Sequence, residues 1–198
     1  MNSGKRLEYS MSRKFTISDT CFIIDWSYYK RRECLVKLFD IVLIPEQVLL
    51  EVEDERSISW ISLQLARGKM QLFTPSPSDL REAERLILEV ASRPYLKRID
   101  IPEALCLIVA RRINAIVLTE NRGALLAAKL LKELKGVTVW RALEVIRESL
   151  VRGIIKVTSE KGVKDIFMEY ERDTSHVFPK RELEKAVKEV LRCLGMKR

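Results

Sequence analysis

The feature that most limits the fold of this chain is a repeated alternation of short β-like runs with helix-like segments. Runs such as 15–18 and 41–44 are brief and apolar, and each is followed by apolar residues at helical spacing. The alternation continues to about residue 157. Parallel strands need long crossover connections, which are usually helices. The pattern therefore predicts a three-layer α/β/α fold around a central parallel sheet.

The last part of the chain departs from this alternation. After residue 157 the pattern predicts two helices, 162–171 and 179–194, joined by the sequence DTSHVF. We expect a core domain over 15–157, a polar and basic N-terminal segment over 1–14, and a C-terminal helical extension over 158–198. A chain of 198 residues is long enough for one sizeable core of this kind.

Within the core domain, the predicted strand ends indicate where a site would lie. Ligands of parallel α/β sheets bind beyond the carboxyl ends of the strands. The polar groups expected there are Asp19, the turn at Pro45 and the triplet Thr119, Glu120 and Asn121. The strands are predicted at 15–18, 41–44, 70–73, 115–118 and 137–139, and the helices at 20–39, 46–55, 57–67, 79–92 (with Ser78 as its N-cap), 103–112, 122–134 and 141–151.

Composition favours an anionic partner and disfavours several other classes. The net charge is +8, although acids are interleaved with the Lys and Arg residues, so an ordinary mixed-charge surface explains it equally well. No window approaches the ~20 apolar residues of a membrane span, and the N-terminus lacks the apolar core of a signal peptide. We therefore expect a soluble, cytoplasmic protein without membrane association.

Cysteine and amide content limit the chemistry further. The four cysteines are scattered, and a single histidine, His176, is too little for a zinc site, so reduced thiols are expected. Gln and Asn are few beside abundant Lys, Arg and Glu, a bias typical of proteins from thermophiles.

Acidic residues stand near several strand ends and helix starts. Each has an ordinary structural explanation: Asp19 and Glu103 suit helix N-termini, Glu51 a solvated surface, and Asn121 an N-cap. Acids surrounded by apolar sequence are costly unless they are paired, protonated or bound to a cation. Several of them at one sheet edge therefore indicate a functional cluster. Asp25 follows Asp19 by six residues, which is too far along a helix for the two to share one ion easily, so we expect it to pair with a nearby base.

Three stretches of the chain together resemble the PIN domain, a family of small nucleases: FTISDTCFIIDW, IPEQVLLEV and IDIPEALCLIVARRINAIVLTENRGALLAA. The family pattern has Asp-Thr after a first strand, a Glu after the second strand, an acid before Ala at a later helix start, and Thr plus an acid after another strand. Asp19, Glu51, Glu103 and the triplet 119–121 match in that order. The resemblance covers residues 15 to about 150.

The resemblance implies a metal-dependent endoribonuclease that hydrolyses RNA phosphodiester bonds with Mg²⁺ or Mn²⁺. Such hard cations take oxygen ligands. Asp19 and Glu103 are expected to bind the metal directly, and Glu51 directly or through water. The position where the family often has its last Asp carries Asn121, so Glu120 or Asn121 would complete a one-metal or asymmetric site. Thr20 and Thr119 are the hydroxyls expected to orient the carboxylates.

Contacts to RNA are expected from Lys30, Arg31, Arg32 and Arg122. Toxin-type PIN proteins pair with an antitoxin and many self-associate, so the resemblance also implies a homodimer and a small protein inhibitor. Two other readings stay open. The chain is either a PIN-like module that binds RNA or protein with little cleavage, or a phosphatase with an Asp nucleophile, which Cys21 disfavours because that class needs a second Asp there.

Overall fold

The computed structural model of the protein describes residues 15–196, and its centre is a single sheet of five strands. All neighbouring strands pair in parallel, in the order β3-β2-β1-β4-β5. The strands are β1 (Phe15–Ser18), β2 (Ile41–Pro45), β3 (Met70–Phe73), β4 (Ile116–Leu118) and β5 (Thr138–Trp140).

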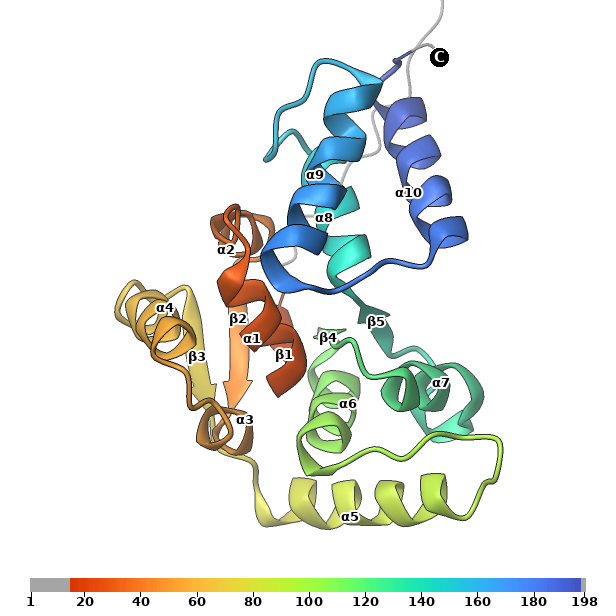
Figure 1. Ribbon diagram of the computed structural model, residues 1–198. Helices are drawn as coiled ribbons and strands as arrows, with labels where there is room; N and C mark the ends of the chain where they lie inside the picture. Colours follow the sequence, from red (N-terminus) through yellow and green to blue (C-terminus); the bar gives the residue numbers. More distant parts are fainter. Residues whose placement is uncertain (1–14, 197–198) are drawn as a thin grey trace, which may run out of the picture.

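Helices connect the strands and continue the chain beyond the sheet (Figure 1). They are α1 (Thr20–Tyr28), α2 (Glu33–Leu38), α3 (Glu46–Leu50), α4 (Glu55–Ala66), α5 (Pro77–Ala91), α6 (Ile101–Ile113), α7 (Arg122–Leu130), the short 3₁₀ turn η1 (Lys132–Leu134), α8 (Ala142–Val151), α9 (Glu160–Thr174) and α10 (Lys180–Cys193).

Different helices cover the two faces of the sheet. On one face, Val42, Ile44 and Leu118 share a hydrophobic core with residues of α1, α2, α4 and α8. On the other, Ile17 and Val117 share a core with residues of α5, α6 and α7. Successive side chains of a strand point to opposite faces, so β4 supplies Leu118 to one core and Val117 to the other. The predicted three-layer α/β/α architecture with a central parallel sheet is confirmed.

The C-terminal helices belong to the first of these cores. Figure 1 shows α8, α9 and α10 side by side, and all three helices contact one another. Phe167 and Tyr170 of α9 and Val190 of α10 are fully buried in the cluster that contains Trp26 of α1. The extension after residue 157 therefore shares its apolar core with the sheet domain. The predicted basic segment 1–14 lies outside the described residues.

Several predicted helices differ from the structure. The helix expected over 79–92 with Ser78 as its N-cap begins at Pro77, because the Ser76 hydroxyl accepts from the Asp79 N–H and caps it instead. The helix expected over 122–134 ends at Leu130, because the chain is extended at Leu131 before the turn η1.

Two other predicted helices are interrupted. The helix expected over 20–39 is divided into α1 and α2, because the chain becomes extended at Tyr29. The Arg32 guanidinium donates to the carbonyl of Ser27 in the last turn of α1. The helix expected over 46–55 stops at Leu50, because Asp54 caps a new helix by accepting from the Ser57 N–H. Both breaks are made by hydrogen bonds rather than by Pro or Gly.

Between residues 15 and 196 the structure has no helix with the length and apolarity needed to cross a membrane.

The strand order fixes where a ligand would bind. From β1 the chain first adds β2 and β3 on one side, and then β4 and β5 on the other. The connections therefore reverse direction between β1 and β4, and such a switch point opens a crevice at the carboxyl ends of the two strands. Asp19 directly follows β1 and Thr119 directly follows β4.

Candidate functional site

Asp19 is completely buried at this switch point. Its backbone N–H donates to the Leu118 carbonyl at 3.0 Å, which ties the end of β1 to β4. Its Oδ1 accepts from the Phe22 N–H at 2.9 Å, so the residue is the N-cap of α1. Its Oδ2 is buried and has no hydrogen-bond partner among residues 15–196. One half of the carboxylate is therefore structural and the other half is unsatisfied.

Burial raises the pKa of Asp19 to about 7, because a charged carboxylate loses its hydration there. The Thr119 hydroxyl and the Phe22 N–H oppose this rise, while the negative charge of Glu103 adds to it. A carboxylate with this pKa is partly protonated near neutral pH and would gain from a nearby positive charge.

Glu103 stands in the first turn of α6 and is nearly buried. Its Oε2 accepts from the Asp100 N–H and its Oε1 accepts from the Asn121 side-chain amide, both at 3.0 Å. The ordinary structural role, closing the N-terminus of a helix, thus applies to Glu103 as well. The same contacts fix the direction of its carboxylate.

Glu51 follows the last residue of α3 and is exposed. The Thr20 hydroxyl donates to its Oε2 at 2.6 Å and so determines its orientation. Cys21 was not among the site residues predicted from the sequence. Its thiol lies close enough to several of the acids for their charges to affect its pKa. Burial raises the pKa of its thiol to about 11, and the charges of Asp19, Glu103, Asp25 and Glu51 add to that rise. The signal available in the sequence was its position two residues after Asp19.

Asn121 has an amide whose orientation is determined by its neighbours. Its Oδ1 accepts from the N–H groups of Gly123 at 2.7 Å and Ala124 at 3.2 Å, so it caps α7. Its backbone N–H donates to the Thr119 hydroxyl at 2.9 Å. Because both capping donors hold the oxygen, the Nδ2 end must be the one that faces Glu103.

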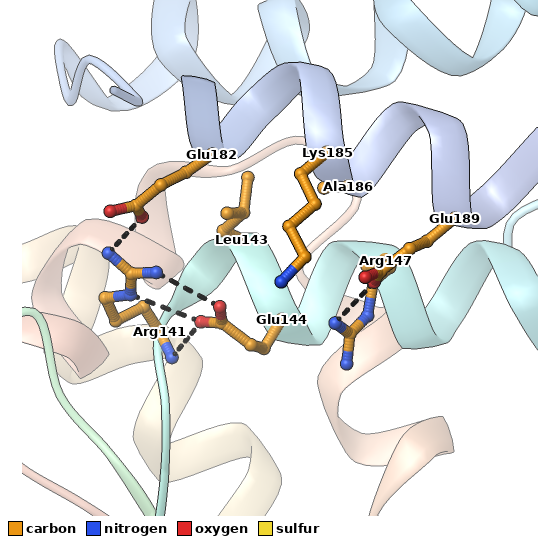
Figure 2. Close-up of a pocket in the computed structure, with 8 residues that line it drawn as sticks. All are labelled: Arg141, Leu143, Glu144, Arg147, Glu182, Lys185, Ala186 and Glu189. Atoms are coloured by element: carbon orange, nitrogen blue, oxygen red, sulfur yellow. Dashed lines mark hydrogen bonds and ion pairs between the residues drawn. The ribbon is translucent and has the colours of Figure 1, made fainter. Parts of the chain in front are cut away.

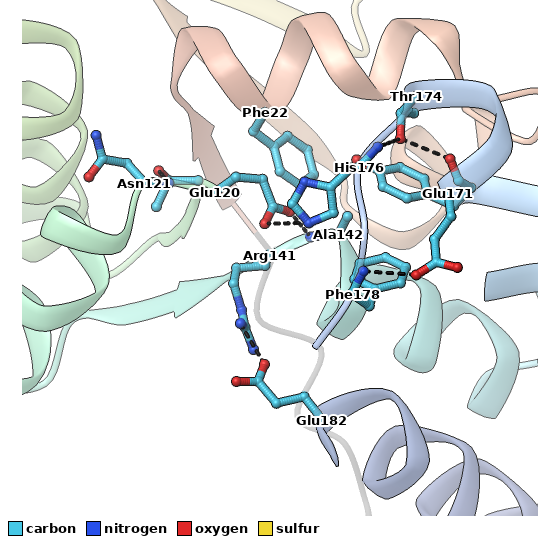
Figure 3. Close-up of polar contacts among 12 residues, drawn as sticks. Phe22, Glu120, Asn121, Arg141, Ala142, Glu171, Thr174, His176, Phe178 and Glu182 are labelled. Atoms are coloured by element: carbon cyan, nitrogen blue, oxygen red, sulfur yellow. Dashed lines mark hydrogen bonds and ion pairs between the residues drawn. The ribbon is translucent and has the colours of Figure 1, made fainter. Parts of the chain in front are cut away.

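Glu120 lies in a different environment from Asn121. Figure 3 shows their side chains pointing to opposite sides of the chain. The Glu120 Oε1 accepts from the Ala142 N–H at 2.7 Å, and its Oε2 lies 3.4 Å from His176 Nε2. Burial raises the pKa of Glu120 to about 7, against the effect of the Ala142 N–H. The structure thus turns this predicted ligand toward α8 and the loop between α9 and α10, because successive side chains of an extended segment alternate in direction.

His176 and Asp25 belong to the same neighbourhood as Glu120. Burial lowers the pKa of His176, and the charge of Asp25 opposes this. Burial raises the pKa of Asp25, which His176 in turn lowers. The base expected beside Asp25 is therefore His176, and it comes from the C-terminal extension.

The four predicted RNA contacts have different surroundings. Lys30 forms an ion pair with Asp173 and Arg31 forms one with Glu169, so both cations are already paired with acids of α9. Arg32 donates to the Ser27 carbonyl and lies over the Trp60 ring. Arg122 is exposed at the first residue of α7, beside Asn121. Contact with RNA remains a prediction for all four.

The acids near Asp19 form no complete cage for a metal. In the described part of the chain, no three His, Cys, Asp or Glu side chains are arranged to hold an ion. The chemistry of the donors nevertheless fits a hard divalent cation, since Asp19 and Glu103 present carboxylate oxygens and the buried Oδ2 of Asp19 lacks a partner. These two residues would hold such an ion, and Glu51 is the third acid nearby.

A pocket of about 300 Å³ lies between α8 and α10, and none of the predicted site acids lines it (Figure 2). Arg141 pairs with Glu144 at 3.1 Å and with Glu182 at 2.6 Å, and Arg147 pairs with Glu189 at 3.0 Å. Both arginines of these walls are thus paired with acids of α8 or α10.

No protein family model and no curated protein matches the chain. Among solved structures, the crystal structure of VapBC2 from Rickettsia felis bound to a DNA fragment from their promoter aligns with 64% of this chain and 98% of that chain, at 16% sequence identity and a TM-score of 0.43. A likeness of this size carries no argument about function.

Proposed function

We propose that this protein is a metal-dependent endoribonuclease that hydrolyses RNA phosphodiester bonds, with Asp19 and Glu103 as its central acids. The observation that carries the proposal is Asp19, a fully buried carboxylate with one unsatisfied oxygen at the switch point of a parallel sheet. Such a group is costly to the fold, and perturbed acids of this kind concentrate at functional sites.

The chain's own residues would prepare the site before any substrate arrives. A bound Mg²⁺ or Mn²⁺ ion supplies charge neutralisation on the phosphate and an acidified water. The Phe22 N–H holds Asp19 Oδ1, which leaves the buried Oδ2 as the oxygen that would bind the ion. The Asp100 N–H fixes Glu103, and the Thr20 hydroxyl fixes Glu51. These contacts limit how far the carboxylates must reorganise when the charge on the phosphate changes.

The charge of the chain supports a polyanionic substrate. The net charge of +8 favours association with RNA, because bound Lys and Arg release counterions from phosphates. Arg122 is exposed at the start of α7, next to the Asn121 that contacts Glu103, and it is the cation that we assign to a substrate phosphate. Lys30 and Arg31 contribute less, since they already pair with acids of α9.

The test is cleavage of mixed RNA by the purified protein with Mn²⁺, with and without a chelator. Asp19→Asn and Glu103→Gln should each lower the cleavage rate by at least about 100-fold, as expected when charge stabilisation is lost from a transition state. Asp54→Asn and Glu144→Gln are matched controls, because Asp54 is an N-cap like Asp19 and Glu144 closes a helix start like Glu103. Equal cleavage by all five proteins would mean contamination and would refute the site.

A second candidate function is a module that binds RNA or protein with little cleavage. The observation that favours it is that the described acids form no three-residue metal cage, with Glu120 turned away and Asn121 uncharged. RNA binding without cleavage in Mn²⁺ would support this candidate. A covalent phosphoryl group on Asp19 would instead support the phosphatase.

A homodimer and an antitoxin-type inhibitor remain predictions that rest on the resemblance. Light scattering of the purified protein tests the first. Copurification with a small protein that abolishes cleavage tests the second.

A further inference from the structure

The amide of Asn121 is held so tightly that it has a single orientation. Its backbone N–H donates to Thr119, its backbone carbonyl accepts from Leu125, and its Oδ1 accepts from two N–H groups of α7. The remaining polar group, Nδ2, lies 3.0 Å from Glu103 Oε1. The side-chain oxygen of Asn121, Oδ1, is therefore unavailable as a metal ligand unless the cap of α7 opens.

Packing around Gly123 holds the start of α7 close to its neighbours and so opposes that opening. A Cβ atom at position 123 would lie 2.5 Å from the Arg98 carbonyl oxygen, 2.7 Å from the Lys97 carbonyl oxygen and 2.9 Å from Asn121 Oδ1. The start of α7 thus lies directly against the chain that leads into α6. The half-buried Asn121 side chain lies between the first turns of the two helices, and Glu103 is on the α6 side.

We propose that Asn121 is a positioning residue: its Nδ2–H takes the place of a second cation beside Glu103 and closes that side of the acid cluster. Both oxygens of Glu103 accept from neutral N–H donors, one from Asp100 and one from Asn121. Among the described acids of the cluster, Asp19 Oδ2 is the buried oxygen without a hydrogen-bond partner, so we place a single ion on the Asp19 side. The part of this inference that concerns the ion rests on the proposed function, whereas the role of Asn121 toward Glu103 does not.

A carboxylate at position 121 would reverse this arrangement. Asp caps helices as well as Asn does, so Asn121→Asp keeps the α7 cap. It replaces the donor by a negatively charged oxygen at about hydrogen-bond distance from Glu103, in a nearly buried place. Two like charges in such a place repel strongly unless a cation lies between them.

The experiment compares thermal unfolding of wild type, Asn121→Asp, Asn121→Ser and the double variant Asn121→Asp/Glu103→Gln, each in chelator and in Mn²⁺. In chelator, Asn121→Asp should lower the Tm by about 4 to 8 °C, which in a chain of this length corresponds to a loss of about 2 kcal/mol. The double variant should recover that loss, and Mn²⁺ should raise the Tm of Asn121→Asp more than that of wild type. Asn121→Ser keeps a capping hydroxyl without the amide, so it measures the loss of the Glu103 contact alone.

Titration calorimetry with Mn²⁺ should give one ion per wild-type chain. The proposal is overturned if Asn121→Asp is as stable as wild type in chelator, if the double variant shows no recovery, or if wild type binds two ions. An Asn121→Asp protein that does not fold in chelator but folds as the double variant supports it. Absence of Mn²⁺ binding by wild type would refute the proposed function, and the unfolding data in chelator would still decide the role of Asn121.

Discussion

At the scale of single residues, Asp19 serves two roles that conflict energetically. Its Oδ1 stabilises the start of α1, whereas its buried Oδ2 has no partner between residues 15 and 196. Its pKa is raised to about 7, so the folded protein holds the proton more tightly than the unfolded chain does. Stability contributed by such a group is present at low pH and falls as the pH rises from about 4 to about 7.

Replacement of Asp19 by Asn should therefore stabilise the protein in chelator while it abolishes activity. The variant keeps the cap and removes the buried charge, so at pH 8 the free energy of unfolding should rise by about 2 to 4 kcal/mol. The gain should shrink as the pH falls toward 4. Urea unfolding at pH 8 and pH 4.5 measures both effects.

Asp54→Asn is the control for this prediction, because Asp54 is an N-cap with the opposite shift. Although burial alone would raise the pKa of Asp54, hydrogen bonds from Ser57 and Tyr28 lower it overall. This replacement should destabilise the protein at pH 8. A loss of stability in Asp19→Asn at pH 8 would contradict the view that Asp19 is a cost to the fold.

At the scale of elements, the site depends on the close approach of two helix N-termini. The first turn of α6 supplies Glu103, and the residue before α7 supplies Asn121. Gly123 allows this approach, because any side chain there would meet the carbonyls of residues 97 and 98. A glycine in a helix is otherwise unfavourable, so its presence in α7 has a packing reason.

Gly123→Ala should destabilise the protein by about 1 to 3 kcal/mol, as overpacking against backbone does. It should also lower cleavage, because the start of α7 would move away from Glu103. Gly162→Ala in α9 is the matched control, since the closest atom to its Cβ would be the Ser159 hydroxyl at 3.3 Å, and it should change stability by less than about 1 kcal/mol. Equal effects of the two replacements would contradict the packing argument.

At the scale of the whole molecule, the C-terminal helices complete the core of the sheet domain. Tyr170 packs against Trp26 and Tyr29 of the first connection, and His176 reaches Glu120 at the end of β4. Lys30 and Arg31 add exposed ion pairs, which contribute little by themselves. Apolar burial is therefore what holds α9 and α10 in place.

Removal of residues 158–198 should leave a protein that aggregates or unfolds without cooperativity, because it exposes the aromatic cluster around Trp26. Within the full chain, Phe167→Ala should cost about 3 to 5 kcal/mol. Its neighbour Met168 is half exposed, so Met168→Ala should cost far less. Calorimetry measures all three proteins, and a truncated protein with an unchanged Tm would show that the tail is an independent appendage.

The sequence by itself determined the layers and most of the elements. The alternation to residue 157 predicted the parallel sheet, because a period of two and a period of 3.6 are local properties of the chain. The same local logic placed Asp19, Glu103 and Asn121 at helix starts. The local pattern did not predict the breaks after Tyr28 and Leu50, since these depend on hydrogen bonds made by Arg32 and Asp54 rather than on Pro or Gly residues.

Only the tertiary structure decided which way the side chains at the strand ends point. Glu120 and Asn121 are neighbours in sequence, yet Glu120 meets His176 of the loop between α9 and α10, and Asn121 meets Glu103 at the start of α6. Capping donors held the Asn121 oxygen, and packing at Gly123 held the cap. The sequence determined which acids reach the edge of the sheet, and the folded structure decided which of them face one another, because that depends on contacts between segments far apart in the chain.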